Sequence, residues 1–269
     1  MATLSELYPW DPETPGERLF LALYDLVKED VPDLFGDRSW FVSTVGLREF
    51  LRLTAAMELT HRCLNSVIEH LRVNPSTPAS TVLQLLRSSV EIYGKGPTVQ
   101  RIAELTLHAG RAALEKHFTP HRADKIHRES NQCCWCGKLV SRLKGTATGS
   151  IATIEHLWPV FLGGSSTHEN GTVACDSCNG ARQHAFSWAW FGVQGFNEKL
   201  DKNQALPRNV RLALALHRLM RVASGQTRIS HKPVSLKTAA KILNVVEPKI
   251  QLHPDRRYTF FELIQLAED

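Results

Sequence analysis

The amino-acid sequence predicts a mainly α protein with a small α+β insert in its second half. Three observations support this fold class. Apolar residues recur at helical spacing through the first 118 residues, and the same pattern returns from residue 207 onward. Between these stretches the sequence changes to short β-branched runs punctuated by glycine and cysteine. We therefore expect three parts: a helical N-terminal domain (1–118), a small cysteine-containing module (119–195) and a basic helical C-terminal region (196–269).

Four helices are expected in the N-terminal domain. Pro32 stops the first, Asn74-Pro75 ends the second, and Pro97 suits the first turn of the fourth. Their leucine, isoleucine and phenylalanine stripes predict a packed core and indicate no particular function. The expected ranges are 17–30, 46–73, 79–93 and 97–118.

The remaining two parts differ from each other in composition and in the spacing of their apolar residues. Residues 119–195 are loop-rich and hold little apolar core of their own, which is typical of small domains that need a metal to fold. The C-terminal region again shows helical spacing, and its first helix mixes arginines with leucines and alanines. The helices expected there are 207–223, 235–245 and 259–267.

Composition narrows the class of protein. The chain has 269 residues, of which 43% are hydrophobic and 22% charged, as in globular proteins. No stretch approaches the roughly 20 apolar residues of a membrane-spanning helix, and no secretory signal is visible, so we expect a cytoplasmic protein. In a reducing cytosol, five cysteines between residues 133 and 178 indicate metal binding before disulfides.

Charge is unevenly distributed along the chain. Residues 1–58 contain 5 Lys/Arg and 11 Asp/Glu, whereas residues 201–269 contain 12 Lys/Arg and 6 Asp/Glu. The basic second half indicates an anionic partner such as DNA, and the acidic N-terminal helices indicate a regulatory protein partner. A solvated surface of mixed charge explains the same counts equally well.

Two Cys-x-x-Cys pairs predict a structural zinc site. Cys133 and Cys136 form the first pair, and Cys175 and Cys178 form the second. Each pair can occupy one edge of a Zn²⁺ tetrahedron, with Zn–S distances of about 2.3 Å. Cys134 could replace Cys133 as a ligand, but the two-residue spacing favours Cys133. A redox dithiol is the competing interpretation, although no βαβ pattern surrounds either pair.

The residues between and after the cysteine pairs form an ordered series of motifs. They are Glu155-His156, Pro159, Gly163-Gly164, Asn170, and Cys178-Asn179-Gly180-Ala181-Arg182. This series resembles the HNH endonuclease family, whose signature runs from an acid–histidine pair through a Pro, a Gly-Gly turn and an Asn to Cys-x-x-Cys-Asn-x-x-Lys/Arg. The resemblance covers about 60 residues, 128–190. It implies a ββα-metal module, in which two antiparallel strands and a helix surround one divalent cation.

The resemblance also implies a role for each site residue. Glu155 and Asn179 would hold the catalytic cation through oxygen atoms, and two protein ligands suit Mg²⁺ or Mn²⁺. His156 would be the general base, because a histidine with the ordinary pKa of about 6.5 accepts a proton from water near neutrality. Asn170 would tie the loop and hold the orientation of the imidazole. The family more often has Asp where this chain has Glu155, whose extra methylene moves the carboxylate by roughly 1 Å or more.

Several arginines are candidates for contact with nucleic acid. Arg182 follows Asn179 by three residues, so both lie on one helical face, and Arg182 would grip a phosphate. Four arginines of the helix expected at 207–223 also lie near one face of that helix. They predict a surface that binds along the DNA backbone, and the alternative is an ordinary polar face in contact with solvent. They are Arg208, Arg211, Arg218 and Arg221.

Three functions fit these residues. The first is a metal-dependent HNH endonuclease that cuts or nicks DNA, of a kind that suits prokaryotic host defence or a mobile element. The second is a non-catalytic zinc-ribbon adaptor that binds nucleic acid or a protein. The third is an RNase on the same scaffold.

Overall fold

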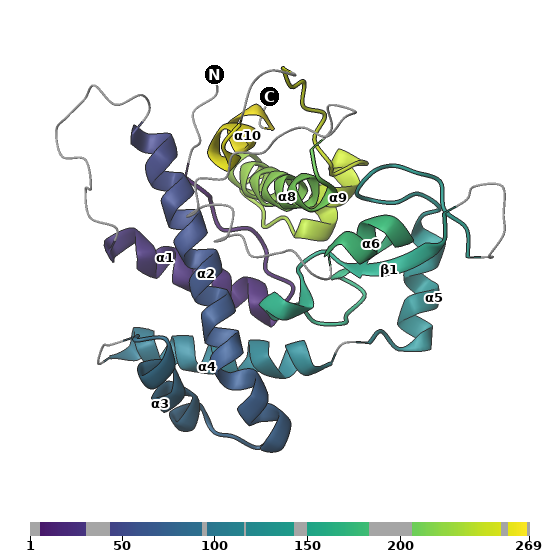
Figure 1. The fold of residues 1–269 in the computed structure, drawn as a ribbon. Helices are drawn as coiled ribbons and strands as arrows, with labels where there is room; N and C mark the ends of the chain where they lie inside the picture. Colours follow the sequence, from purple (N-terminus) through teal and green to yellow (C-terminus); the bar gives the residue numbers. More distant parts are fainter. Residues whose placement is uncertain are drawn as a thin grey trace.

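The structure, a computed structural model, is mainly helical, and its described residues contain one two-stranded antiparallel sheet (Figure 1). The mainly α prediction is therefore confirmed. The described residues are 6–30, 44–92, 96–115, 117–142, 150–182, 206–253 and 258–267, without the side chains at 28–30, 44–45 and 182.

Four helices make up the N-terminal region, each beginning and ending close to its predicted range. Thr14 and Glu17 open the first helix with a capping box: the Thr14 hydroxyl accepts from Glu17 N at 3.2 Å, and Glu17 Oε2 accepts from Thr14 N at 2.9 Å. Apolar faces of all four helices enclose a core of their own, which includes Leu64 and Leu86. The helices are α1 (Pro15–Asp30), α2 (Thr44–Val73), α3 (Ala79–Ser89) and α4 (Pro97–Leu114).

A fifth helix, α5 (Pro120–Glu129), follows where none was predicted. The predicted helix 97–118 ends at Leu114, and Thr119 begins a new helix by accepting a hydrogen bond from Arg122 N at 3.4 Å. Ile126 is the buried residue of α5, so the segment carries no apolar stripe that periodicity could reveal.

The small sheet is a hairpin that runs directly into a helix. Strand β1 (Ala152–His156) pairs with β2 (Gly171–Cys175), which places Glu155 opposite Thr172 and His156 opposite Gly171. The loop between them contains the 3₁₀ helix η1 (Val160–Leu162), and α6 (Asp176–Arg182) follows β2 without a gap. The order strand, strand, helix is thus the order that the motif series predicts. Helix α5 covers the hairpin so closely at Gly171 that a Cβ there would lie 2.2 Å from Ile126 Cδ1.

The C-terminal region contains α8 (Arg208–Ser230), α9 (Leu236–Leu243) and α10 (Phe260–Leu266). Every residue of α8 from Leu212 to His217 is buried, so this stretch of the helix is covered on all sides, and α8 lies beside α9 and α10 (Figure 1). Among the helices that the structure describes, none combines the length and apolar character needed to cross a membrane.

One apolar core joins all three predicted parts of the chain. It includes Phe20 of α1, Trp158 of the β1–β2 loop and Phe260 of α10. The Trp158 and Phe20 rings, from two different predicted parts, are 5.3 Å apart between centroids. This core includes residues from both sides of the boundary predicted at residue 118, and the boundary predicted at 195 lies outside the described residues.

Burial of Glu17 predicts a stability that depends on pH. Burial raises the pKa of Glu17 from 4.5 to about 7, despite hydrogen bonds from Trp10 and Thr14 that favour the charged form. The folded protein therefore binds this proton more tightly than the unfolded chain does. This contribution to stability is complete below a pH of about 4.5 and is lost as the pH rises through about 7.

We expect Glu17→Gln to abolish the loss of stability with rising pH, which amounts to about 3 kcal/mol in the free energy of unfolding. Denaturant unfolding of the wild type and the variant from acidic to slightly basic pH measures it. Glu104→Gln, at an exposed carboxyl of α4, is the matched control. Parallel stability curves for the wild type and Glu17→Gln would contradict the prediction.

Candidate functional site

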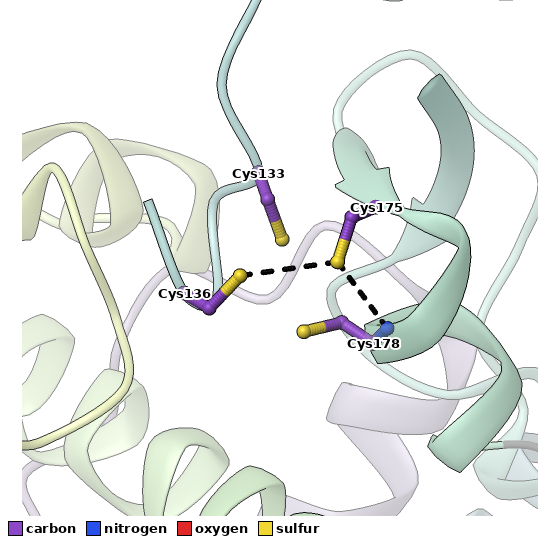
Figure 2. Close-up of side chains that lie close together, drawn as sticks. All are labelled: Cys133, Cys136, Cys175 and Cys178. Carbon is purple, nitrogen blue, oxygen red and sulfur yellow. Dashed lines mark hydrogen bonds between the residues drawn. The ribbon is translucent and has the colours of Figure 1, made fainter. Parts of the chain in front are cut away.

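Four cysteine side chains converge beside the hairpin (Figure 2). Their Sγ atoms all lie within 4.8 Å of one another, and the atoms of Cys136 and Cys175 are 3.8 Å apart. A tetrahedron with Zn–S distances of about 2.3 Å has edges of about 3.8 Å, so this separation fits two ligands of one zinc ion. The chemistry and spacing of the four sulfurs make a possible structural zinc site, as predicted. Its members are Cys133, Cys136, Cys175 and Cys178.

Each cysteine pair is presented by a tight local structure. The turn 133–138, which we call the knuckle, is closed by hydrogen bonds of 2.8 Å from Cys133 N to Lys138 O and from Gly137 N to Cys133 O. Gly137 has φ +72°, in the left-handed region that favours glycine. The second pair spans the junction of β2 and α6, where Cys178 N donates to Cys175 Sγ at 3.4 Å. Backbone geometry therefore positions both pairs.

The four thiols do not all ionise readily on their own. The Cys178 thiol donates a hydrogen bond to Cys133 and lowers the pKa of Cys133 to about 5. The same bond raises the pKa of Cys178, and burial raises the pKa of Cys136 to about 11. Four thiolates at this distance therefore require a cation among them, which is the charge that a zinc ion would supply.

Cys134 lies outside the sulfur cluster. Its backbone N donates to Val173 O at 2.9 Å, and its carbonyl accepts from Val246 N at 2.9 Å. The residue thereby joins the knuckle to β2 and to the C-terminal segment, and its side chain lines a pocket beside Lys237. The preference for Cys133 over Cys134 agrees with this geometry.

Two arginines predicted to contact nucleic acid, Arg211 and Arg218, have partners within the protein. Arg211 Nη1 lies 2.6 Å from Glu247 Oε1. Arg218 Nη1 donates to the carbonyls of Val245 at 3.2 Å and Val246 at 3.3 Å. Val246 and Glu247 in turn donate their backbone N–H groups to the knuckle. Both guanidinium groups therefore hold the C-terminal segment in place, and their contact with nucleic acid stays a prediction.

His156 is the last residue of β1 and is half-buried. Its ring lies against Phe118, with centroids 4.5 Å apart and planes inclined by 31°. Its Nε2 atom is 3.0 Å from Ser166 Oγ, which donates to Glu115 O at 2.6 Å. The sequence did not reveal Phe118, Ser166 or Glu115 as site residues, because no motif includes them and folding alone brings them to the imidazole.

Asn170 is buried and ties the loop that connects β1 to β2. Its Oδ1 accepts from Trp158 N at 2.7 Å, and its Nδ2 donates to the carbonyls of Trp158 and Ser165, each at 3.0 Å. These bonds hold Trp158 and Ser165 of the loop to the residue just before β2. The residue after Ser165, Ser166, contacts the His156 imidazole, and the predicted role of Asn170 in orienting that ring stays a prediction.

Glu155 belongs to β1 and Asn179 belongs to α6, and both lie near the C-terminal end of β1. Asn179 Nδ2 donates to Ile154 O at 3.2 Å, which holds the side-chain amide of α6 against the strand. Glu155 is 7% exposed, and its Oε1 accepts from His156 N at 2.9 Å. The carboxylate thus lies against the backbone of the next residue. Each of the two side chains carries an oxygen donor of the kind that Mg²⁺ and Mn²⁺ prefer.

The strand register sets the directions of two predicted site residues. Successive side chains leave a strand on opposite faces, so Glu155 and His156 point to opposite sides of β1. Arg182, the third residue after Asn179, ends α6, and its side chain lies outside the described part of the structure.

The chain matches no known family model, no curated protein and no solved structure. Within the described part of the chain, the four cysteines are the one group of three or more His, Cys, Asp or Glu side chains that could hold a metal. The metal site therefore rests on its own geometry.

The sulfur cluster predicts one zinc ion per chain. We expect Cys136→Ser to lose this zinc and Cys134→Ser to keep it, since only the first serves the cluster. Loss of the metal removes the link through the sulfurs between the knuckle and the β2–α6 junction and should lower the melting temperature by on the order of 10 °C. Elemental analysis and calorimetry of both variants measure these effects, and equal zinc contents would contradict the assignment.

Asn170→Asp tests the loop anchor. The variant replaces an amide that donates to two carbonyls with a buried carboxylate oxygen that faces them, which should cost about 3 kcal/mol of stability. Chemical denaturation near neutral pH measures the loss. Asn65→Asp, exposed on α2, is the control. A variant at position 170 as stable as this control would show that the anchor is dispensable.

Proposed function

We propose that the protein is a metal-dependent endonuclease of the HNH type, which hydrolyses DNA phosphodiester bonds. The observation that supports the proposal is that two motif amides bind the backbone on either side of the Glu155-His156 pair. Asn179 binds the backbone just before Glu155, and Asn170 binds the backbone just after Leu157, so the two amides bracket the Glu155-His156 pair. A zinc ribbon that has no catalytic activity needs no such pair of amide contacts on either side of a histidine.

The reaction assigned to this site is hydrolysis by an activated water. The His156 imidazole takes a proton from water, and the oxygen attacks the scissile phosphorus. The bond from phosphorus to the 3′ oxygen breaks, which leaves 5′-phosphate and 3′-hydroxyl ends. The leaving oxygen takes up a proton from solvent, so atoms and charge balance.

Glu155 and Asn179 are the residues that would hold the catalytic cation. Their carboxylate and amide oxygens suit Mg²⁺ or Mn²⁺. Such a cation would stabilise negative charge on the phosphate and on the leaving oxygen. The bond from Asn179 Nδ2 to Ile154 O commits the nitrogen to β1, so Oδ1 is the amide atom that would hold a cation.

Cleavage of a supercoiled plasmid tests the proposal. We expect the zinc-loaded protein to produce open-circle or linear DNA when Mg²⁺ or Mn²⁺ is added, and His156→Ala to lower the rate at least 100-fold because the general base is lost. His108→Ala, at an exposed position of α4, is the matched control and should cleave like the wild type.

The controls separate the proposed nuclease from its rivals. Zinc content and melting temperature of His156→Ala should equal those of the wild type, so that lost cleavage reflects lost chemistry. If the wild type and His156→Ala both leave DNA intact but bind it, the zinc-ribbon adaptor is the better assignment. Preference for RNA over DNA of the same sequence would favour the RNase.

A further inference from the structure

The hydroxyl of Ser166 has two close neighbours and one proton to give. Ser166 Oγ is 2.6 Å from Glu115 O and 3.0 Å from His156 Nε2. A carbonyl oxygen can only accept, so the serine proton is donated to Glu115. Ser166 Oγ is then the acceptor toward the ring, and His156 Nε2 must carry a hydrogen.

We propose that Ser166 is a positioning residue that fixes the tautomer of His156, so that Nε2 is protonated and Nδ1 is the basic nitrogen. The tautomer itself follows from the hydrogen bonds, whereas its use in water activation rests on the proposed nuclease function. A neutral imidazole has one basic nitrogen, and the hydrogen bond made by the other nitrogen selects which one it is. Ser166 thereby determines which edge of the ring faces the reacting water.

Ser166 is itself held on several sides. Its residue is 2% exposed, and its carbonyl accepts from Arg122 Nη1 of α5 at 3.0 Å. The preceding residue, Ser165, is fixed by Asn170 Nδ2 at 3.0 Å. Glu115 caps the C-terminus of α4, where carbonyl groups have no partner within the helix, so its carbonyl is available to the serine. The hydroxyl therefore has little freedom to rotate away.

The plane of the imidazole is set by the same segment of chain. Phe118, three residues after Glu115, lies against the ring with a 31° inclination. An aromatic neighbour on the face and a serine on the edge together fix both the plane and the rotation of the imidazole. The two contacts depend on Glu115, at the end of α4, which binds the serine, and on Phe118, just before α5. The end of the helical N-terminal region thus completes the environment of the candidate base.

Nitrogen NMR of the ring tests the tautomer without any assay of activity. Two-bond ¹H–¹⁵N correlation of histidine-labelled protein distinguishes protonated from unprotonated ring nitrogens, and His156→Ala identifies the signals among the 12 histidines. At a pH of about 8, where an ordinary histidine is neutral, we expect Nε2 of His156 to be protonated and Nδ1 unprotonated. A proton on Nδ1 in the wild type would overturn the proposal.

Variants at the two adjacent serines test the positioning role. Ser166→Ala removes the acceptor, and we expect the His156 signals to shift toward a mixture of tautomers. The plasmid-cleavage rate at saturating DNA should fall roughly three- to tenfold, the loss expected for one hydrogen bond, with little change in KM. Ser165→Ala is the control, because Ser165 Oγ approaches only Thr167 Oγ, at 3.5 Å, in the described contacts.

The outcomes separate this inference from the proposed function. A wild type with the expected tautomer but no nuclease activity would defeat the function and leave the tautomer assignment intact. An active wild type in which Ser166→Ala changes neither the tautomer nor the rate would overturn the positioning role alone. Should Ser166→Ala fail to fold, the wild-type spectrum still decides the tautomer.

Discussion

The cluster of four sulfurs is the constraint on which the geometry of the site depends. Its second pair lies where β2 becomes α6, so the position of the cluster determines where α6 begins and how it meets the hairpin. Asn179 directly follows Cys178 and reaches the carbonyl of Ile154 from there. A zinc ion in this place would therefore do more than stabilise a small fold, because it would hold the side-chain amide of Asn179 at a fixed position relative to the end of β1.

The hairpin and knuckle are embedded in the rest of the chain from both sides. On one side, Gly16 N of α1 donates to Gly163 O at 3.0 Å, and a Cβ at Gly16 would lie 2.0 Å from Leu162 O, so only glycine allows this approach. On the other side, Val246 and Glu247 donate to the knuckle and are held by α8. The helical regions that flank the motif series are thus structural parts of the site and not separate attachments.

Sequence reasoning succeeded where the signal is local and failed where it is not. Helical periodicity located the long helices, and Cys-x-x-Cys spacing selected Cys133 over Cys134, because both signals lie within a few residues. Helix α5 was missed, since a helix with one buried residue has no apolar stripe. The arginines of α8 have the spacing of an exposed face, yet Arg211 and Arg218 bind a segment 27 to 36 residues away. Ser166 and Glu115, which are 51 residues apart, share no motif at all.

The β1–β2 loop is anchored at several points along its length. Trp158 anchors its start in the apolar core, three side-chain hydrogen bonds of Asn170 tie it to the residue before β2, and the Ser166 carbonyl is bound by Arg122. Because Glu155 and His156 leave β1 on opposite faces, the proposed nuclease requires a phosphate that lies beyond the end of the strand, where this loop begins. On that proposal, the anchored loop would keep such a phosphate within reach of two adjacent residues that face apart.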